Sequence, residues 1–484
     1  MGLRIYNTLT REKRDFQPLQ PGKVGMYVCG MTVYDMCHLG HARSAVLFDV
    51  IYRYLMHRGY DVTFVRNFTD VDDKIINRAN ELGEEWKSLA ERFVGEFYVD
   101  MDALGILRPT FEPRATEFIE EMQSLIQRLV SSGHAYEANG DVMFSVNSFV
   151  GYGKLSGKRI DELISGARVD VDEKKRNPLD FALWKAAKPG EPFWESPWGP
   201  GRPGWHIECS AMSMRLLGEE FDIHGGGADL AFPHHENEIA QSEAATGKHF
   251  AKYWIHNGFV NISSEKMSKS LGNVLNIRDI LKSVHPEALR LFLISSHYRS
   301  PLDYNESSIK ESASALERLY AAMVAVDDVS NRNGTSDELP EELADMSDRF
   351  TEAMDDDFNT PRALAILFGV ARSINRYSTS DSLSEIPRPH LLARVKDEVI
   401  SLSREILGIL KEEPAHFMEN LRKSGVVGLE ISEEEIESLI AQRAQARSKK
   451  DFARADEIRR ALADNHILLE DSPKGTTWKV GENT

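Results

Sequence analysis

A histidine and a glutamate near the middle of the sequence are spaced to hold a metal ion. Proline opens the segment Pro233–Ile239 as a first-turn residue, and His234 and Glu238 follow four residues apart. Side chains at this spacing lie one turn above each other on one face of a helix. The pair could offer two ligands to a metal, although a hydrogen-bonded His–Glu pair on a surface helix has the same sequence.

Two of the three cysteines stand where further ligands could come from. Cys29 ends a short apolar run, and Cys209 lies in Trp205–Ser210, where a stretch rich in Pro, Gly and Trp returns to ordinary sequence. Zinc favours four ligands of the Cys, His and carboxylate types, so these two cysteines would complete a set. A free cysteine is usually a small buried hydrophobe, and spacing alone leaves both interpretations open. Cys37 is predicted to be structural.

Two short motifs could bind a polyphosphate. His38-Leu39-Gly40-His41 begins a helical pattern directly after a strand and a loop, where free N–H groups and the helix dipole favour phosphate. Lys266-Met267-Ser268-Lys269-Ser270 is a cationic loop, and lysines placed in this way stabilise charge on transferring phosphates. Taken alone, the first could be a helix start with two exposed histidines, and the second a solvated surface loop.

The elements around these motifs predict a parallel α/β fold. Met26–Val28 and Val62–Val65 have the composition of strands, and the apolar spacing between them is helical up to Gly59. A strand, a helix and a strand in this order form a βαβ unit with a right-handed crossover. Phe221–His224 and Tyr253–Ile255 are predicted to be further strands of the sheet.

Such sheets bind ligands beyond the carboxyl ends of their strands. Thr69 and Asp70 follow the second predicted strand, so they are candidate substrate contacts. Asp70 could instead cap the helix that follows, or serve in both roles.

The sequence predicts three domains. A Rossmann-like, parallel-sheet catalytic domain is expected over residues 1–310, with an insertion at about 120–204 and the lysine–serine loop at 266–270. An α-helical bundle is expected over 311–412 and a small C-terminal domain over 425–484. The insertion is indicated by the Pro-, Gly- and Trp-rich residues 188–205, which suit neither a helix nor a central strand. After Arg299 the pattern is wholly helical, and residues 441–462 are predicted to be one basic amphipathic helix.

Composition narrows the functional class. The chain has 484 residues, of which 42% are hydrophobic and 28% charged, as in ordinary globular proteins. No run is apolar enough to span a membrane, the start turns polar at once, and three cysteines are too few for a disulfide framework, so a cytoplasmic protein is expected. The net charge of −18 argues against non-specific nucleic-acid binding. Residues 441–450 nevertheless carry four basic residues and no acidic one, which suits a specific RNA partner or a solvated helix face.

The motifs together resemble those of class I aminoacyl-tRNA synthetases. His38-Leu39-Gly40-His41 resembles their HIGH signature, with leucine in place of isoleucine, and Lys266-Met267-Ser268-Lys269-Ser270 matches their KMSKS signature. Cys29, Trp205–Ser210 and Phe232–Glu238 are similar to segments of the cysteinyl-tRNA synthetase family. The similarity is collinear from about Arg4 to Trp478.

The resemblance implies roles for single residues. The zinc ligands would be Cys29, Cys209, His234 and Glu238. Thr69, Trp205 and Asp229 would line the amino-acid pocket, with Asp229 binding the ammonium group. ATP, with Mg²⁺, would be held by His38, Gly40, His41 and Lys269, and the catalytic residues would be His38, His41, Lys266 and Lys269. The tRNA anticodon would be contacted by Arg447, Phe452, Asp456 and Asp471, where Phe452 replaces the tryptophan of some relatives.

This resemblance implies a ligase that joins L-cysteine to tRNA(Cys) through a cysteinyl-adenylate. Because zinc prefers a soft thiolate to a hydroxyl, we expect cysteine to be selected without a hydrolytic editing domain. The protein is expected to be a monomer. One alternative is a ligase that transfers cysteinyl-adenylate to a small amine, as in mycothiol synthesis. Another is a non-catalytic RNA-binding paralogue, against which the intact KMSKS motif and predicted metal ligands argue.

Overall fold

A computed structural model describes residues 2–159, 175–262, 265–266, 274–426, 431–472 and 475–480. The chain divides into two compact units. The first contains residues 1–316, 338–370 and 397–409, and the second contains 317–337, 371–396 and 410–484. Both units therefore take parts of the helical region expected over 311–412. Among the described residues, no helix is both long and apolar enough to cross a membrane.

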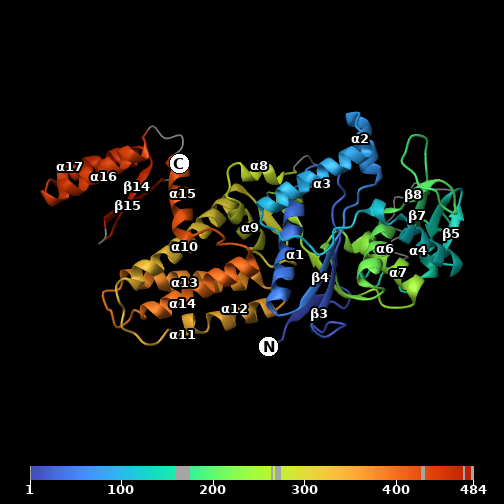
Figure 1. Ribbon diagram of the computed structural model, residues 1–484, viewed down its shortest axis with the longest axis horizontal. Coiled ribbons are helices and arrows are strands. Elements are labelled where there is room, and N and C mark those ends of the chain that lie inside the picture. The colour runs from blue at the N-terminus through green and yellow to red at the C-terminus, as the bar shows by residue number, and fades with distance from the viewer. Residues whose placement is uncertain are drawn as a thin grey trace. The chain divides into compact units, whose positions relative to one another are not determined.

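The first unit is built on a four-stranded parallel sheet (Figure 1). Its order is β10 (Ala251–Asn257), β9 (Phe221–Gly227), β3 (Lys23–Val28) and β4 (Asp61–Arg66). All four predicted strands and their parallel arrangement are confirmed. The chain leaves β3 for β4 on one side and returns to β9 on the other. The topological switch point therefore lies between β3 and β9, where ligands bind in such sheets.

Helix α1 (Leu39–His57) connects β3 to β4 and lies beside the sheet (Figure 1). The side chain of His38 caps its first turn, and His41 bonds back to the backbone of His38, which completes a capping box. Gly59 follows the last turn with φ of 82°, a conformation that glycine adopts without strain. The helix that apolar spacing predicted is confirmed, and its position sets both histidines at the carboxyl end of β3.

The segment between β4 and β9 contains an antiparallel sheet of its own. Helices α2 (Asp73–Leu82), α3 (Trp86–Ala103) and α4 (Ile119–Ser131) precede it. Its strands are β5 (Ala135–Ala138), β6 (Asp141–Phe144), β7 (Phe181–Ala186) and β8 (Gly201–Pro203), in that spatial order. Pro203 lies on the edge strand β8, where a residue without an N–H is tolerated. Helix α6 (Trp205–Leu217) then leads into β9, and α7 (Glu236–Thr246) connects β9 to β10.

The remaining elements are shorter strands and the helices that follow β12 (Glu265–Lys266) in sequence. The strands are β1 (Arg4–Asn7), β2 (Glu12–Asp15), β11 (Val260–Ile262), β12 and β13 (Leu302–Tyr304). The helices are α8 (Ile277–Leu281), α9 (Pro286–Ile294), α10 (Glu306–Ser330), α11 (Glu341–Ala344), α12 (Met346–Asp355), α13 (Thr360–Thr379), α14 (Pro389–Leu402) and α15 (Pro414–Val426).

Two expectations for the C-terminal half are wrong. The chain after Arg299 is not wholly helical, because β13 pairs with β11 and a hairpin forms from β14 (Ile467–Ser472) and β15 (Gly475–Val480). Residues 441–462 are not one helix but parts of two, α16 (Glu433–Ser448) and α17 (Phe452–Asp464). The break occurs because Lys450 has φ of 62° and Asp451 caps the start of α17.

Candidate metal and nucleotide site

Four side chains from distant parts of the first unit converge beside the switch point. Cys29 follows β3, and its N–H donates to the carbonyl of Gly225 in β9 at 3.1 Å. Cys209 comes from α6, and Glu238 from the first turn of α7. His234 comes from the helical turn Ala231–His235 just before α7. The structure thus brings all four predicted ligands together, with one ligand atom of each within 4.8 Å of the others.

The separations within this cluster, which we call the cage, suit a tetrahedral ion. The two sulfur atoms of Cys29 and Cys209 are 3.7 Å apart. Oε1 of Glu238 lies 3.5 Å from Sγ of Cys29 and 3.1 Å from Nε2 of His234. A tetrahedral zinc ion with bonds of about 2.0–2.3 Å separates its ligand atoms by roughly 3.3–3.8 Å. The donor set and its spacing therefore fit zinc.

The surroundings of the cage favour the ligand forms of Cys209 and Glu238 but not that of Cys29. Burial raises the pKa of Cys209, but the hydrogen bond from Cys29 and the nearby His234 outweigh it and bring the pKa to about 6. Burial and the adjacent Cys209 raise the pKa of Cys29. Burial also opposes ionisation of Glu238, yet His224 and His234 lower its pKa to about 2. One thiolate and one carboxylate are thus favoured before any cation is considered.

The predicted amino-acid pocket residues lie at the same edge of the sheet. The ring of Trp205 stacks on His234 with centroids 4.2 Å apart. Thr69, which follows β4, donates to the buried Glu208 at 2.8 Å, and Glu208 is the residue before Cys209 in α6. Asp229 is exposed in the loop after β9, where a Cβ on Gly227 would lie 2.5 Å from its Oδ1. Glycine therefore leaves room for this carboxylate.

Asp70 does not cap α2, the helix that follows it. Its carboxylate accepts from the backbone N–H of Thr116 at 3.0 Å and from the Thr116 hydroxyl at 2.6 Å. Helix α2 is capped instead by Asp72, which accepts from Lys74 N at 2.9 Å. The capping alternative considered for Asp70 is therefore wrong, because the neighbouring Asp72 takes that place.

The start of α1 contacts a residue that follows the lysine–serine loop in sequence. The rings of His38 and His41 stack with centroids 3.7 Å apart at the start of α1, where Gly40 is the second helical residue. The N–H of Leu39 donates to the carbonyl of Leu275 at 2.9 Å, a few residues after the lysine–serine loop. Lys269 lies outside the described residues, and Lys266 is described only through the pairing of β12 with β11.

The second unit ends in a small domain whose core holds α16 and α17 against the hairpin. That core consists of Ile436, Ile440, Ile458, Leu462, Ile467 and Trp478. Arg443 binds the Asp471 carboxylate with two bonds of 2.7 Å, and Arg447 adds a third at 2.9 Å. Phe452 begins α17 and is 63% exposed, and Asp456 is exposed on the same helix. The structure thus brings Arg447 and Asp471 together.

The bonds to Asp471 predict a pH dependence. Arg443 and Thr476 hold the pKa of Asp471 well below its usual range, so this carboxylate stabilises the hairpin above the unfolded pKa of about 3.9. The contribution is lost as pH falls through the lower, folded pKa. We expect Arg443→Met to speed amide hydrogen exchange in residues 467–480 at pH 7, and to do so less as pH drops below about 4. A difference from the parent chain that stays constant with pH would contradict this.

Sequence reasoning missed several polar residues that are buried or partly buried around the cage. His224 donates to Glu238 at 2.9 Å, and His206 bonds His234 at 2.9 Å. His235 bonds His256 at 2.8 Å, and burial lowers the pKa of both. One signal was available, since His224 interrupts an apolar strand just before three glycines. A polar residue in a central strand indicates a nearby partner.

Comparison with known proteins identifies the parts of the chain. Residues 15–314 match the family model described as tRNA synthetases class I (C) catalytic domain. Residues 349–411 match the DALR domain, and residues 432–478 match the cysteinyl-tRNA ligase anticodon binding domain. Among solved structures, methionyl-tRNA synthetase of Mycobacterium tuberculosis has a TM-score of 0.63 at 16% identity, covering 83% of this chain and 94% of that one. This likeness shows the class I fold.

Closely similar sequences narrow the family. The cysteine–tRNA ligase of Geobacter metallireducens is 57% identical over 486 residues, which span 99% of this chain and 100% of that protein. That of Trichlorobacter lovleyi is 55% identical over 487 residues, with the same coverage. Identity at this level over the whole length shows a common family. The chain therefore belongs to the cysteine–tRNA ligases, within the class I aminoacyl-tRNA synthetases.

Proposed function

We propose that the chain ligates L-cysteine to tRNA(Cys) through a cysteinyl-adenylate made from ATP and Mg²⁺, with zinc held by Cys29, Cys209, His234 and Glu238. The observation that carries the proposal is that Cys29 of the cage and the start of α1 both follow β3. We infer from this that a thiolate-selective site and a phosphate-binding helix terminus lie at one edge of the sheet. We further propose that the protein acts as a monomer in the cytoplasm.

Selection of cysteine over serine is assigned to the cage. A pocket that merely fills space separates such similar substrates by only about 1–3 kcal/mol. Zinc held there would supply a soft centre that prefers the substrate sulfur to a hydroxyl oxygen. Around it, Trp205 forms one wall of the pocket, Thr69 binds the amino acid at the end of β4, and Asp229 pairs with its ammonium group. No editing domain is needed in this scheme.

Activation requires positioning and charge stabilisation, and no protein nucleophile. A carboxylate oxygen of the bound cysteine attacks the α-phosphorus of ATP, and the bond to pyrophosphate breaks. His38 and His41, at the N-terminus of α1, bind the phosphates together with the backbone around Gly40. Lys266 and Lys269 stabilise the charge that develops on the departing pyrophosphate. A terminal ribose hydroxyl of the tRNA then attacks the acyl carbon, and AMP leaves.

Lys269→Ala is expected to slow cysteine-dependent ATP–pyrophosphate exchange by about 10²–10³-fold, since it removes one electrostatic stabiliser of the transition state. Zinc content and cysteine affinity should stay unchanged, because this lysine is assigned to neither the cage nor the amino-acid pocket. Lys282→Ala, in an exposed pair with Asp279, is the control and should leave the exchange rate as it is. Near-parental exchange in Lys269→Ala would refute its role.

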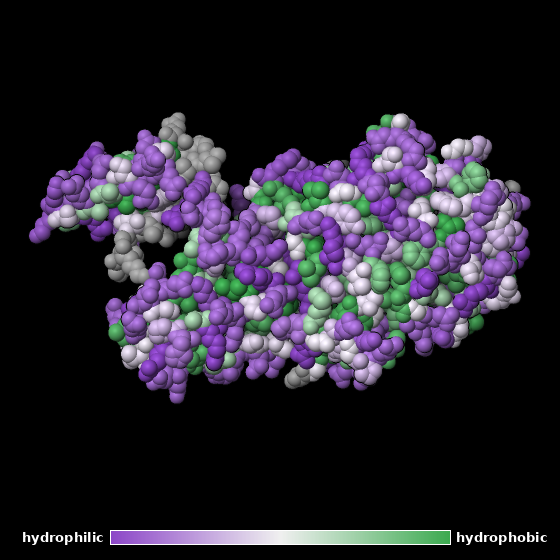
Figure 2. All heavy atoms as spheres, viewed as in Figure 1, coloured by the Kyte–Doolittle hydropathy of each residue, from purple (hydrophilic) through white to green (hydrophobic). Residues whose placement is uncertain are grey.

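The residues from 425 to 484 are proposed to read the anticodon, with 1–310 as the catalytic domain and 311–412 as the helical bundle between them in sequence. Arg447 and Asp471 would bond the bases, Asp456 would add a contact, and the exposed Phe452 would stack on one of them. Hydrophilic residues cover most of the drawn face of α16 and α17, which suits a polar RNA partner (Figure 2). The paired guanidinium groups of Arg443 and Arg447 hold Asp471 in place.

Aminoacylation of a tRNA(Cys) transcript with cysteine is the decisive test. Charging that depends on the transcript, and that stops when the anticodon is changed, supports the proposal. Formation of cysteinyl-adenylate without charging, but with transfer to a small amine, would support the mycothiol-type alternative instead. That alternative is not favoured, because the match to an anticodon binding domain over 432–478 serves no purpose in a small-molecule ligase. Absence of adenylate formation would indicate a non-catalytic RNA-binding protein.

A further inference from the structure

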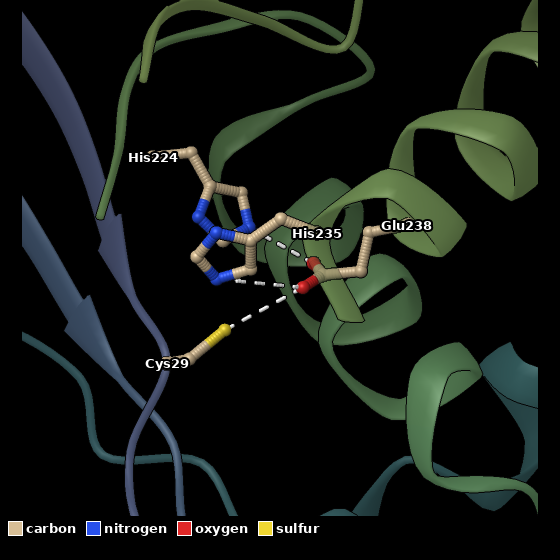
Figure 3. Close-up of side chains that lie close together, drawn as sticks. All are labelled: Cys29, His224, His235 and Glu238. Carbon is tan, nitrogen blue, oxygen red and sulfur yellow. Dashed lines mark hydrogen bonds and ion pairs between the residues drawn. The ribbon is translucent and has the colours of Figure 1, made fainter. Parts of the chain in front are cut away.

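The two carboxylate oxygens of Glu238 face different partners. Oε1 is turned toward the cage, 3.5 Å from Sγ of Cys29 and 3.1 Å from Nε2 of His234. Oε2 is turned away and lies 2.9 Å from Nε2 of His224, as the dashed lines of Figure 3 show. Both side chains of this second contact are fully buried. An ionised carboxylate only accepts, so Nε2–H of His224 donates to Oε2.

The His224 ring is held on both sides by the sheet. It lies in β9 directly opposite Tyr27 of β3 and Trp254 of β10. Side chains opposite one another on paired strands share a face of the sheet. The ring stacks on Trp254 with centroids 4.4 Å apart and meets the Tyr27 ring edge-on at 5.3 Å. The imidazole therefore cannot swing away, and it presents Nε2 to Glu238 in a fixed direction.

A second group of side chains raises the question of whether His224 is itself a metal ligand. Cys29, His224, His235 and Glu238 also have ligand atoms within 4.8 Å of one another (Figure 3). This group shares two members with the cage, so His224 could itself be read as a ligand. The ring nitrogen that faces the group is already engaged with Oε2 of Glu238. His235 is also farther away, since its Nε2 lies 4.0 Å from Oε1 of Glu238, against 3.1 Å for His234.

We infer that His224 is a positioning residue that holds Glu238 as a one-oxygen ligand of the proposed zinc. The inference rests on the proposed function, because it concerns the same metal. With Oε2 bonded to His224, only Oε1 is free to face the cage, and the carboxylate cannot rotate or offer both oxygens. Outer partners of this kind orient a ligand, and their loss typically weakens metal binding by about 10–100-fold.

Three substitutions distinguish the effect of the His224 N–H donor from the effect of packing by its ring. His224→Phe keeps a ring against Trp254 but removes the N–H. His224→Gln places an amide N–H near the original Nε2, whereas the shorter His224→Asn leaves it out of reach. The matched control is His256→Phe, because His256 lies in the same buried layer and bonds His235 and Thr8, which are outside the cage.

The zinc dissociation constant of each full-length chain is measured by competition with a chelating indicator, together with the visible spectrum of the Co²⁺ form. We expect affinity to fall about 10–100-fold in His224→Phe and His224→Asn, to stay within a few-fold of the parent in His224→Gln, and to be unchanged in His256→Phe. The Co²⁺ spectrum should keep the intensity of a four-ligand site in all of them. If His224→Phe does not fold, the comparison of glutamine with asparagine decides the question.

Two results would overturn the inference. Parental zinc affinity in His224→Phe or in His224→Asn would show that the bond to Oε2 does not position Glu238. Loss of one zinc equivalent with a changed Co²⁺ spectrum would show that His224 is itself a ligand. Failure of the proposed function is distinct, since the parent chain would then bind no stoichiometric zinc at all.

Discussion

Cys209→Ser is expected to abolish stoichiometric zinc and to lower kcat/KM for cysteine by more than 100-fold. Serine keeps the size of the side chain but replaces a thiolate that zinc binds strongly with a hydroxyl that stays protonated. Loss of a direct ligand should reduce metal affinity and activity by more than about 100-fold, which is the upper end of the effect of losing an outer-shell partner. The cage would keep Cys29, His234 and Glu238, which is one donor short of the tetrahedral set.

Discrimination between cysteine and serine should collapse in the same variant. Without the soft centre, only shape and hydrogen bonding remain, and these separate such substrates by about 10–200-fold. The measurements are zinc per chain by elemental analysis and the ratio of kcat/KM values for the two amino acids in ATP–pyrophosphate exchange. Removing zinc from the parent chain with a chelator should reproduce the loss of selectivity, and returning zinc should restore it.

Cys37→Ser is the matched control for this experiment. Cys37 is also a buried cysteine of the first unit, but its sulfur lies against Met31 at 3.5 Å and takes no part in the cage. Zinc content and selectivity should therefore stay at parental values, even if stability falls slightly. Full zinc content in Cys209→Ser would contradict ligation by Cys209.

Asp49→Ala is expected to lower the free energy of unfolding of the first unit by about 3–5 kcal/mol, because it leaves the buried guanidinium of Arg290 without its counter-charge. The side chains of Asp49 and Arg290 are 1% and 0% exposed and form a direct ion pair. Asp49 also accepts from Arg53 and from the backbone N–H of Leu107. Burial lowers the pKa of Arg290, as expected for a cation removed from water.

Urea unfolding of the full chain, followed in the transition that reports the first unit, measures this effect. The control is Glu81→Ala, which breaks an exposed pair with Arg78 and should cost less than about 1 kcal/mol. Replacing both partners, as in Asp49→Leu with Arg290→Met, should recover part of the stability, since the buried charge of Arg290 is removed while Arg53 still lacks its partner. A loss below about 1 kcal/mol in Asp49→Ala alone would show that Arg290 finds another partner.

Local sequence determined α1 and the four strands of the parallel sheet. The apolar spacing after His38 and the glycine at position 59 predicted α1, and the structure gives it the bounds Leu39–His57. All four strands of the parallel sheet were predicted from short apolar runs that stop at glycine or polar residues. These signals act within a few residues, so they do not depend on contacts with distant parts of the chain.

Prediction from local pattern failed where the signal in the sequence is weak, or where the structure is set by contacts with distant residues. The expected helix over 441–462 is interrupted because Lys450 adopts a positive φ and Asp451 caps a new helix. Strand β13 exists only because it pairs with β11, and three residues carry too little pattern to show it. The helical region 311–412 belongs to both compact units, a division that depends on packing and not on periodicity.

The sequence by itself supplied the residue types and motifs that indicate this chemistry, and the family to which they belong. Only the tertiary structure decided that Cys29 and Cys209, 180 positions apart, face each other, and which oxygen of Glu238 faces them. It also revealed His224, which no spacing links to the residues of the cage. The physical reason is that capping and periodicity are local, whereas a cage is assembled from side chains whose distances are set by the packing of helices on a sheet.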